Sequence, residues 1–339
     1  MYTARRYPKS WWNRVAFVCE PTGHLVGTFI LDRVGAGYKS ASPFNLVASQ
    51  DEWAAPTMAE VGPDGNVWVI DWYNFIVQHN PTPQGFTTGK GNAYESELRD
   101  KKYGRIYRVV YQGDEGLDAA ALAKADQSVK NGLNPSDEKA LVEALQHPTM
   151  LWRKTAQRLL IERVKLKQET LAALQALVNQ GPSDSDKLCV GSMHALWVLD
   201  GVGALSEATT SKALKHASPG VRRNALQVAK NGPATLAAIV DNQLLMDTDL
   251  QVRLAALLKV SDIPDYQDAL GAVLSQPDRI ASVALWAEVR NDKWLLDAWT
   301  AAASRHASKV LTSMMNQKDL KLSPASLNRV SIVSEHVAR

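Results

Sequence analysis

The aromatic residues of this chain are gathered at one end, and this distribution most constrains the fold. All five Phe, eight of the nine Tyr and five of the ten Trp lie in residues 1–112, and the rest of the chain is rich in Ala, Leu, Lys and Gln. Aromatic and β-branched residues favour half-buried strands, whereas Ala and Leu favour helices. The sequence therefore predicts a β part at 1–112, a linker with a first helix at 113–135, and a helical part at 136–339.

Charge and hydropathy give no indication of nucleic-acid binding or of a membrane-spanning segment. The 339 residues carry a net charge of +3, and 22% of them are charged. Because the basic residues are scattered, there is no electrostatic basis for nucleic-acid binding. No apolar run reaches the roughly 18 residues of a membrane-spanning helix, so we expect no transmembrane segment. The N-terminal MYTARRYPKSWWNRVAFV has too short an apolar run for a signal peptide.

Two segments of the β part match at an offset of 51 residues. FVCEPTGHLV at 17–26 aligns with WVIDWYNFIV at 68–77, and each reads as a strand, a tight turn and a second strand. The second segment follows VGPDGN at 61–66, where Pro fixes φ and Gly accepts a positive φ. A β repeat of about fifty residues has the size of a propeller blade. The match therefore predicts about two blades of a β-propeller; the alternative is a chance similarity between two hairpins.

A long connection at 79–109, HNPTPQGFTTGKGNAYESELRDKKYGRIYRV, follows the second segment. Connections of this length are usually functional. Its amides, acids and aromatic rings are the groups that bind carbohydrate, because polar groups fix hydroxyls and a ring covers an apolar sugar face. The alternative is a clasp that covers the β part and binds nothing. The ligand-binding candidates on the strand end and the connection are Asp71, Tyr73, Asn74, His79, Asn80, Asn92, Tyr94, Glu95 and Arg99.

Two acids occupy equivalent places in the matched segments. Glu20 aligns with Asp71, each at the end of an apolar strand. Carboxylates in such positions are suited to Ca²⁺, which takes several oxygen ligands. Glu20 and Asp71 are therefore candidate calcium ligands. The alternative is that each acid closes a turn or pairs with an arginine.

The helical part contains a short internal repeat. Ala-Leu pairs recur at 195–196, 225–226, 256–257 and 284–285, after the turn sequences HPT at 147, SPG at 218, DTD at 247 and QPD at 276. Each helix pair of such a repeat has an apolar face that only a neighbouring pair can bury. The pattern predicts an α-solenoid of HEAT-like repeats. Arg222 and Arg253 hold corresponding places, and we expect them to bond to turn carbonyls or to acids of neighbouring repeats.

The series GPDG, DWYN and GRIYRV, within residues 10–112, resembles the closing part of glucose/sorbosone dehydrogenase-like β-propellers. The chain resembles more closely the membrane-bound dehydrogenase-like family, in which such a propeller precedes HEAT-like repeats. This resemblance implies pyrroloquinoline quinone and Ca²⁺ as cofactors and a periplasmic or extracellular location. It also implies a cytochrome c-like module as a partner. The motifs are not a catalytic signature, so no catalytic residue is assigned.

Two blades are too few for a propeller, which needs about four to eight. We therefore expect the chain to be the C-terminal part of a longer parent and inactive by itself. The first functional hypothesis is a quinone-dependent sugar or alcohol dehydrogenase whose helical repeats dock a partner. The alternative is a non-catalytic scaffold that binds carbohydrate or protein.

Overall fold

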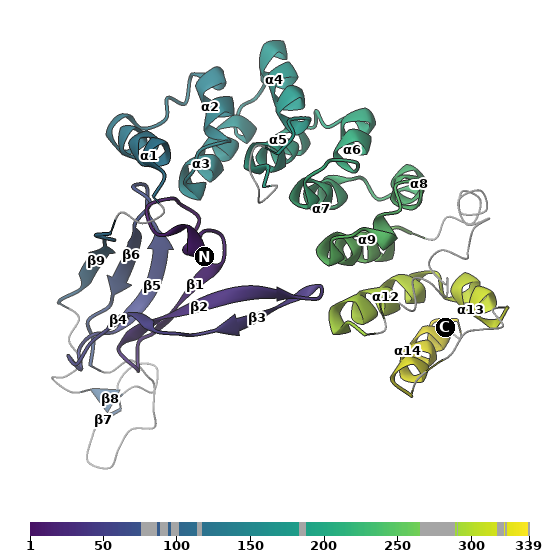
Figure 1. Ribbon diagram of the computed structural model, residues 1–339, viewed down its shortest axis with the longest axis horizontal. Helices are drawn as coiled ribbons and strands as arrows, with labels where there is room; N and C mark the ends of the chain where they lie inside the picture. The colour runs from purple at the N-terminus through teal and green to yellow at the C-terminus, as the bar shows by residue number, and fades with distance from the viewer. Residues whose placement is uncertain are drawn as a thin grey trace. The chain divides into compact units, whose positions relative to one another are not determined.

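The structure is a computed structural model, and it divides the chain into two compact units. Unit 1 contains Met1–Asp32 and Lys39–Ala156, and unit 2 contains Arg33–Tyr38 and Gln157–Arg339. The secondary structure of both units is shown in Figure 1. The residues that the structure describes are 1–75, 87–88, 94–95, 102–113, 117–182, 188–264, 289, 291–316, 322 and 324–337.

The strands form two small antiparallel sheets and a separate pair. In the first sheet β2 pairs with β1, β3 and β4, the second sheet has the order β5-β6-β9, and β7 pairs with β8. Strand β1 packs against β5, which brings the first two sheets together (Figure 1). The strand bounds are β1 Val15–Glu20, β2 Leu25–Val34, β3 Gly37–Ala41, β4 Asn45–Ala48, β5 Pro56–Val61, β6 Val67–Asp71, β7 Thr87–Thr88, β8 Tyr94–Glu95 and β9 Arg105–Val109.

The N-terminal segment forms part of the core of unit 1. The Tyr2 N–H donates to the Val15 carbonyl at 2.6 Å, and the rings of Tyr2 and Tyr7 stack with centroids 4.5 Å apart. The Tyr7 hydroxyl accepts from the Val67 N–H at 3.0 Å and donates to the Val109 carbonyl at 2.6 Å. Burial raises the pKa of Tyr7 to about 12, so this hydroxyl stays protonated. The two tyrosines thereby tie the first sheet to the second.

The predicted Pro-Asp-Gly turn is confirmed between β5 and β6. The Gly62 N–H donates to the Asn66 carbonyl at 2.8 Å, and Gly65 has a φ of +83°. The Asp64 carboxylate accepts from the Asn66 N–H at 3.1 Å and from the Trp68 indole at 3.0 Å. Glycine is required at residue 65 because other residues rarely adopt this backbone conformation.

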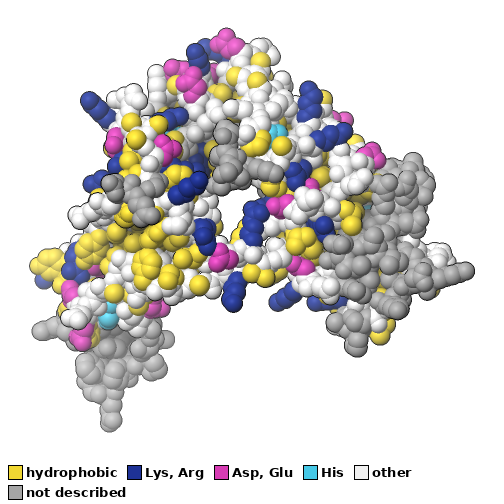
Figure 2. Space-filling model, in the orientation of Figure 1, with side chains coloured by type: hydrophobic (Ala, Val, Ile, Leu, Met, Phe, Trp, Pro, Cys, Tyr) yellow, Lys and Arg dark blue, Asp and Glu magenta, His cyan; other side chains and the backbone are white. Residues whose placement is uncertain are grey.

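Strand β6 presents apolar side chains on both faces of its sheet. Val67 and Val69 are fully buried, whereas the alternate residues Trp68 and Ile70 are 37% and 45% exposed. Ile106 lies opposite Ile70 on β9 and is 68% exposed. Figure 2 shows hydrophobic side chains gathered over this sheet. An exposed apolar patch of this kind marks an interaction surface or a site of aggregation.

The fold class predicted from the sequence, a partial β-propeller followed by a HEAT-like α-solenoid, is wrong. The structure has two small antiparallel sheets and a set of helices, and its described part contains no propeller and no closed sheet. The physical reason lies in strand pairing. β1 pairs with β2, the strand that directly follows it, whereas β6 pairs with β5 before it and with β9 after the long connection. Residues 72–75 after β6 form no strand, so the two matched segments do not share one hairpin structure.

The helices of unit 2 bury the repeated Ala-Leu pairs. The pairs at 195–196, 225–226 and 256–257 lie on α5, α7 and α9, and each residue is at most 1% exposed. These three helices pack in succession, and α9 packs against α12. The pair at 284–285 lies outside the described residues. The helix bounds are α1 Ala119–Asn131, α2 Glu138–Ala144, α3 Met150–Ile161, α4 Gln168–Val178, α5 Val190–Gly201, α6 Glu207–Ala213, α7 Pro219–Val228, α8 Pro233–Asp241, α9 Leu250–Asp262, α12 Lys293–Arg305, α13 Ala307–Met315 and α14 Pro324–Glu335.

The repeated arginines connect successive turns of unit 2. The Arg222 guanidinium donates to the His216 carbonyl at 2.7 Å and pairs with Asp247 in the following turn, also at 2.7 Å. The Arg253 guanidinium donates to the Asp247 carbonyl. The expectation that these arginines bond to turn carbonyls and to an acid of the next turn is confirmed. Among the helices that the structure describes, none is both long and apolar enough to cross a bilayer.

Candidate functional site

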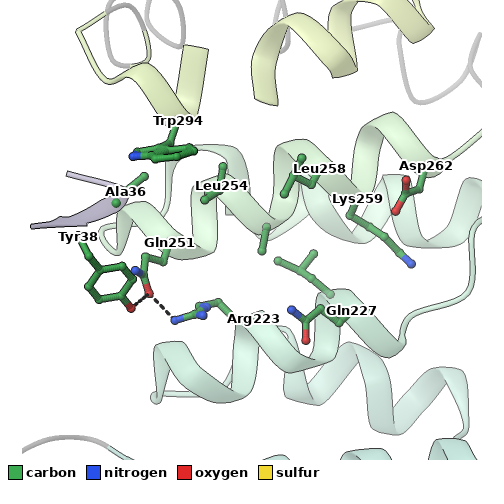
Figure 3. Close-up of a pocket in the computed structure, with 13 residues that line it drawn as sticks. Ala36, Tyr38, Arg223, Gln227, Gln251, Leu254, Leu258, Lys259, Asp262 and Trp294 are labelled. Atoms are coloured by element: carbon green, nitrogen blue, oxygen red, sulfur yellow. Dashed lines mark hydrogen bonds between the residues drawn. The ribbon is translucent and has the colours of Figure 1, made fainter. Parts of the chain in front are cut away.

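Unit 2 contains a pocket of about 660 Å³, which is within the usual range for ligand sites (Figure 3). Its walls come from α7, α9, the first turn of α12 and residues 36–38, which lead into and begin β3. The residues that line it are Ala36, Gly37, Tyr38, Arg223, Leu226, Gln227, Gln251, Leu254, Ala255, Leu258, Lys259, Asp262 and Trp294.

One face of α9 forms the length of this pocket. Its lining residues fall at 251, 254, 255, 258, 259 and 262, a spacing of three and four that keeps them on one side of a helix. At a rise of about 1.5 Å per residue, this face extends over about 16 Å. Its middle is apolar, with Leu254 and Leu258 pointing into the pocket, and Leu258 is 46% exposed. The pocket is therefore an elongated groove with an apolar floor, here called the α9 groove.

A hydrogen-bonded cluster closes one end of the α9 groove. The Tyr38 hydroxyl donates to Gln251 Oε1 at 3.0 Å, and the Arg223 guanidinium donates to the same oxygen. These two hydrogen bonds hold the side-chain amide of Gln251 in place, and the residue is only 5% exposed. Among the described residues none accepts a hydrogen bond from Gln251 Nε2, which leaves this nitrogen as a donor for a ligand.

The Gly-Ala-Gly segment at 35–37 is fitted to the start of α12. The Ala36 N–H donates to Asp292 Oδ2 at 2.7 Å, and Asp292 Oδ1 also caps α12 by accepting from the Trp294 N–H at 2.9 Å. Gly35 has a φ of +61°, and a Cβ on Gly37 would lie 2.2 Å from the Trp294 indole nitrogen. Only glycine at both positions permits this approach. The indole is thereby fixed along the edge of the groove.

Charged residues lie at the opposite end of the α9 groove, where Figure 3 shows Lys259 and Asp262. Lys259 is 8% exposed although it carries an ammonium group. Burial lowers the pKa of Lys259, and the negative charges of Asp262 and Asp200 offset part of that effect. In the described part of the chain, no carboxylate lies within 4.0 Å of its Nζ.

Asp71, the first of the predicted ligand-binding residues, lies in unit 1 at the end of β6. Its carboxylate accepts from the Ala55 N–H at 2.7 Å, the Tyr73 N–H at 2.9 Å, Arg105 Nε at 2.9 Å and the Tyr107 hydroxyl at 3.0 Å. Burial alone would raise the pKa of Asp71, but these donors outweigh it and the pKa lies below its ordinary value. Asp71 is 1% exposed, and it is the buried centre of an ion-pair network whose other members, Arg105 and Asp51, are partly exposed.

The two neighbouring candidates belong to the same corner of unit 1. The Arg105 guanidinium carbon lies 3.7 Å from the centroid of the Tyr73 ring, and Arg105 also pairs with Asp51 at 3.1 Å. Asn74 is buried, with 1% exposed. The structure therefore brings Asp71, Tyr73 and Asn74 together. His79, Asn80, Asn92 and Arg99 lie outside the described residues, and only the backbone of Tyr94 and Glu95 is described, in β8.

Glu20, the second candidate calcium ligand, lies on the other sheet from Asp71. Glu20 Oε1 accepts from the N–H groups of Thr22 at 2.9 Å and Gly23 at 3.3 Å, so it closes the β1–β2 turn. Glu20 therefore closes a turn, and Asp71 pairs with Arg105. Both arrangements are those of the alternative interpretation, in which each acid closes a turn or pairs with an arginine. Across the described residues, no group of three or more His, Cys, Asp or Glu side chains is placed to hold a metal ion.

Calcium finds no fitting set of ligands among the described residues. The four donors already on Asp71 would have to be displaced by an ion, and Glu20 is engaged on another sheet. The α9 groove was not predicted from the sequence. Its only local signals are the Gly-Ala-Gly segment at 35–37 and the lysine inside an apolar helix face at 259.

Comparison with known proteins adds a family match for the N-terminal third of the chain. A protein-family model described as a domain of unknown function, DUF7133, matches residues 1–113. No curated protein matches the chain. The matched region contains both sheets of unit 1 and the 33–38 segment that unit 2 includes, and the description of the family assigns no activity to it.

Proposed function

We propose that the protein is a binding protein and that the α9 groove of unit 2 holds an extended segment of a partner polypeptide. The observation that carries this proposal is the continuous α9 face from Gln251 to Asp262, apolar in its middle and polar at both ends. An extended chain rises about 3.3 Å per residue, so about five residues match the 16 Å of the groove. Alternate side chains of such a segment would reach the leucines, and Gln251 Nε2 would bond to its backbone.

The lining of the groove favours a peptide over a sugar. Aliphatic side chains of a bound peptide would contribute favourably to the binding free energy when they are buried against Leu254 and Leu258. Of the two aromatic rings in the lining, the Trp294 indole lies against Gly37 and has the Lys293 ammonium 5.3 Å from its centroid, and the Tyr38 hydroxyl is bonded to Gln251.

A defined peptide set tests the proposal. Fluorescein-labelled pentapeptides with Leu at positions 2 and 4 and varied residues at 1, 3 and 5 are titrated by fluorescence anisotropy. Leu258→Asp places a charge on the groove floor, and we expect it to weaken binding at least about tenfold. Leu327→Asp, on α14 and 54% exposed outside the groove, is the matched control and should bind like the unchanged protein. The proposal fails if no peptide binds with a Kd below about 1 mM, or if Leu258→Asp binds as well as the control.

Sugar or alcohol oxidation by a longer periplasmic parent stays a prediction from the resemblance alone. Docking of a cytochrome c-like module on the helices is also a prediction from the resemblance alone. The peptide groove is compatible with a scaffold role for the helices. The described residues offer no fitting calcium site, and no chemical step is assigned to this chain.

A further inference from the structure

The ammonium group of Lys259 is the charge in the α9 groove that has no ion-pair partner among the described residues. Lysine is almost never this deeply buried unless it is paired, because an ammonium loses its hydration on burial. Lys259 is only 8% exposed, and among the described residues no carboxylate is within ion-pair distance of it. Lys259 is one of the residues that line the groove.

The internal repeat shows that a lysine is not needed here for packing. The Ala-Leu pairs of α5, α7 and α9 are each followed two residues later by Val198, Val228 and Lys259. The two valines are 0% and 7% exposed, so the equivalent position is an apolar core position in the preceding helices. A buried ammonium at this position costs stability, because it loses its hydration.

The other cation of the groove is already engaged. Arg223 donates to Gln251 at the opposite end, where it orients that amide. The lining contains two cationic residues, Arg223 and Lys259, and one acidic residue, Asp262, so it carries an excess of positive charge. A ligand that neutralises Lys259 would therefore bind at the Asp262 end of the apolar floor.

We propose that the segment held in the α9 groove carries a carboxylate that pairs with Lys259, so that the groove selects acidic peptides. This inference rests on the proposed peptide function. The carboxylate has two sources, an Asp or Glu side chain or the C-terminus of the partner. Pairing would remove the cost of the buried charge in the bound state, because the ion pair forms in a largely desolvated site.

Peptides that differ only in charge provide the first test. The best leucine-containing pentapeptide is prepared with Glu and an amidated C-terminus, with Gln and a free C-terminus, and with Gln and an amidated C-terminus. The unchanged protein should prefer one of the first two over the third by at least about tenfold. Lys259→Met should abolish that preference, whereas Lys230→Met, an exposed lysine outside the groove, should keep it. Equal binding of all three peptides would overturn the carboxylate inference and leave the peptide function standing.

Small probes and stability give a second test that needs no peptide. Butyrate should raise the melting temperature of the unchanged protein more than butyramide does, and Lys259→Met should remove this difference. Lys259→Met should itself melt higher than the unchanged protein, because it removes a buried ammonium that has no carboxylate partner in the described part of the chain. If peptides fail to bind but both results hold, the peptide function is wrong and the carboxylate site stands. The inference is overturned if butyrate and butyramide act alike, or if Lys259→Met melts lower.

Discussion

Unit 1 contains a histidine whose protonation should set the acid limit of its stability. His147 is 1% exposed, in the turn before α3. The Thr149 N–H donates to His147 Nδ1 at 3.0 Å, so the ring proton resides on Nε2, which lies 3.1 Å from the Ser128 hydroxyl. Protonation of Nδ1 would turn this accepting nitrogen into a donor facing the Thr149 N–H. Only the neutral ring satisfies both contacts.

The size of the effect follows from the pKa of His147. Burial and the positive charges of Lys124 and Arg153 lower the pKa of His147 from 6.5 to about 4. In the unfolded chain the ring takes up its proton near pH 6.5, whereas in the folded chain it does so only near pH 4. Stability is therefore full above pH 6.5 and falls as the pH decreases towards 4. The total loss is about 3 kcal/mol, and most of it should appear by pH 4.5.

Urea unfolding at pH 7 and pH 4.5, followed by circular dichroism, measures this loss. His147→Asn is the matched variant, because an asparagine oxygen can accept from the Thr149 N–H and does not titrate. Carboxylates that titrate in the same interval affect both proteins, so the difference between them isolates the histidine. We expect the unchanged protein to lose about 2 to 3 kcal/mol more than His147→Asn. Equal losses in the two proteins would refute the assignment of a buried neutral His147.

Two further substitutions test the contacts that hold each unit. Asp71→Ala should destabilise unit 1 by about 3 kcal/mol in urea unfolding, because it leaves Arg105 Nε and two backbone N–H groups without their acceptor; a loss below about 1 kcal/mol would contradict a central role for the buried Asp71 carboxylate. Gly37→Ala should destabilise unit 2 by about 1 to 3 kcal/mol, because its Cβ would overlap the Trp294 indole. Gly181→Ala, which has nothing within 4 Å, is the control and should change stability by less than about 1 kcal/mol; equal effects would place Gly37 away from the indole.

Local patterns in the sequence predicted local structure correctly. The Ala-Leu pairs mark buried helix faces, and the SPG and DTD turns precede α7 and α9. The alignment of Glu20 with Asp71 also has a structural basis, because each acid accepts from the N–H group two residues later. A hydrogen bond between residues i and i+2 depends on neighbouring residues alone, so a sequence match can detect it.

Strand pairing could not be predicted from the same match. The segments that contain Glu20 and Asp71 look alike, yet β6 finds its partner β9 more than thirty residues later. The propeller prediction failed because it treated a shared turn as evidence for a shared hairpin. Register and pairing are set by long-range burial, here by Val67 and Val69 against the N-terminal tyrosines, and no pattern within ten residues records that contact.

The α9 groove could be detected only by comparing the repeats with one another. The contact between Tyr38 and Gln251 joins residues 213 positions apart, which no periodicity encodes. The change from Val198 and Val228 to Lys259 is different, because it breaks an otherwise regular core pattern within the sequence itself. Functional sites are expected at positions where a residue breaks the local sequence pattern and lowers stability. Measuring whether Lys259→Met raises the melting temperature therefore also tests whether this departure from the repeat has a function to explain it.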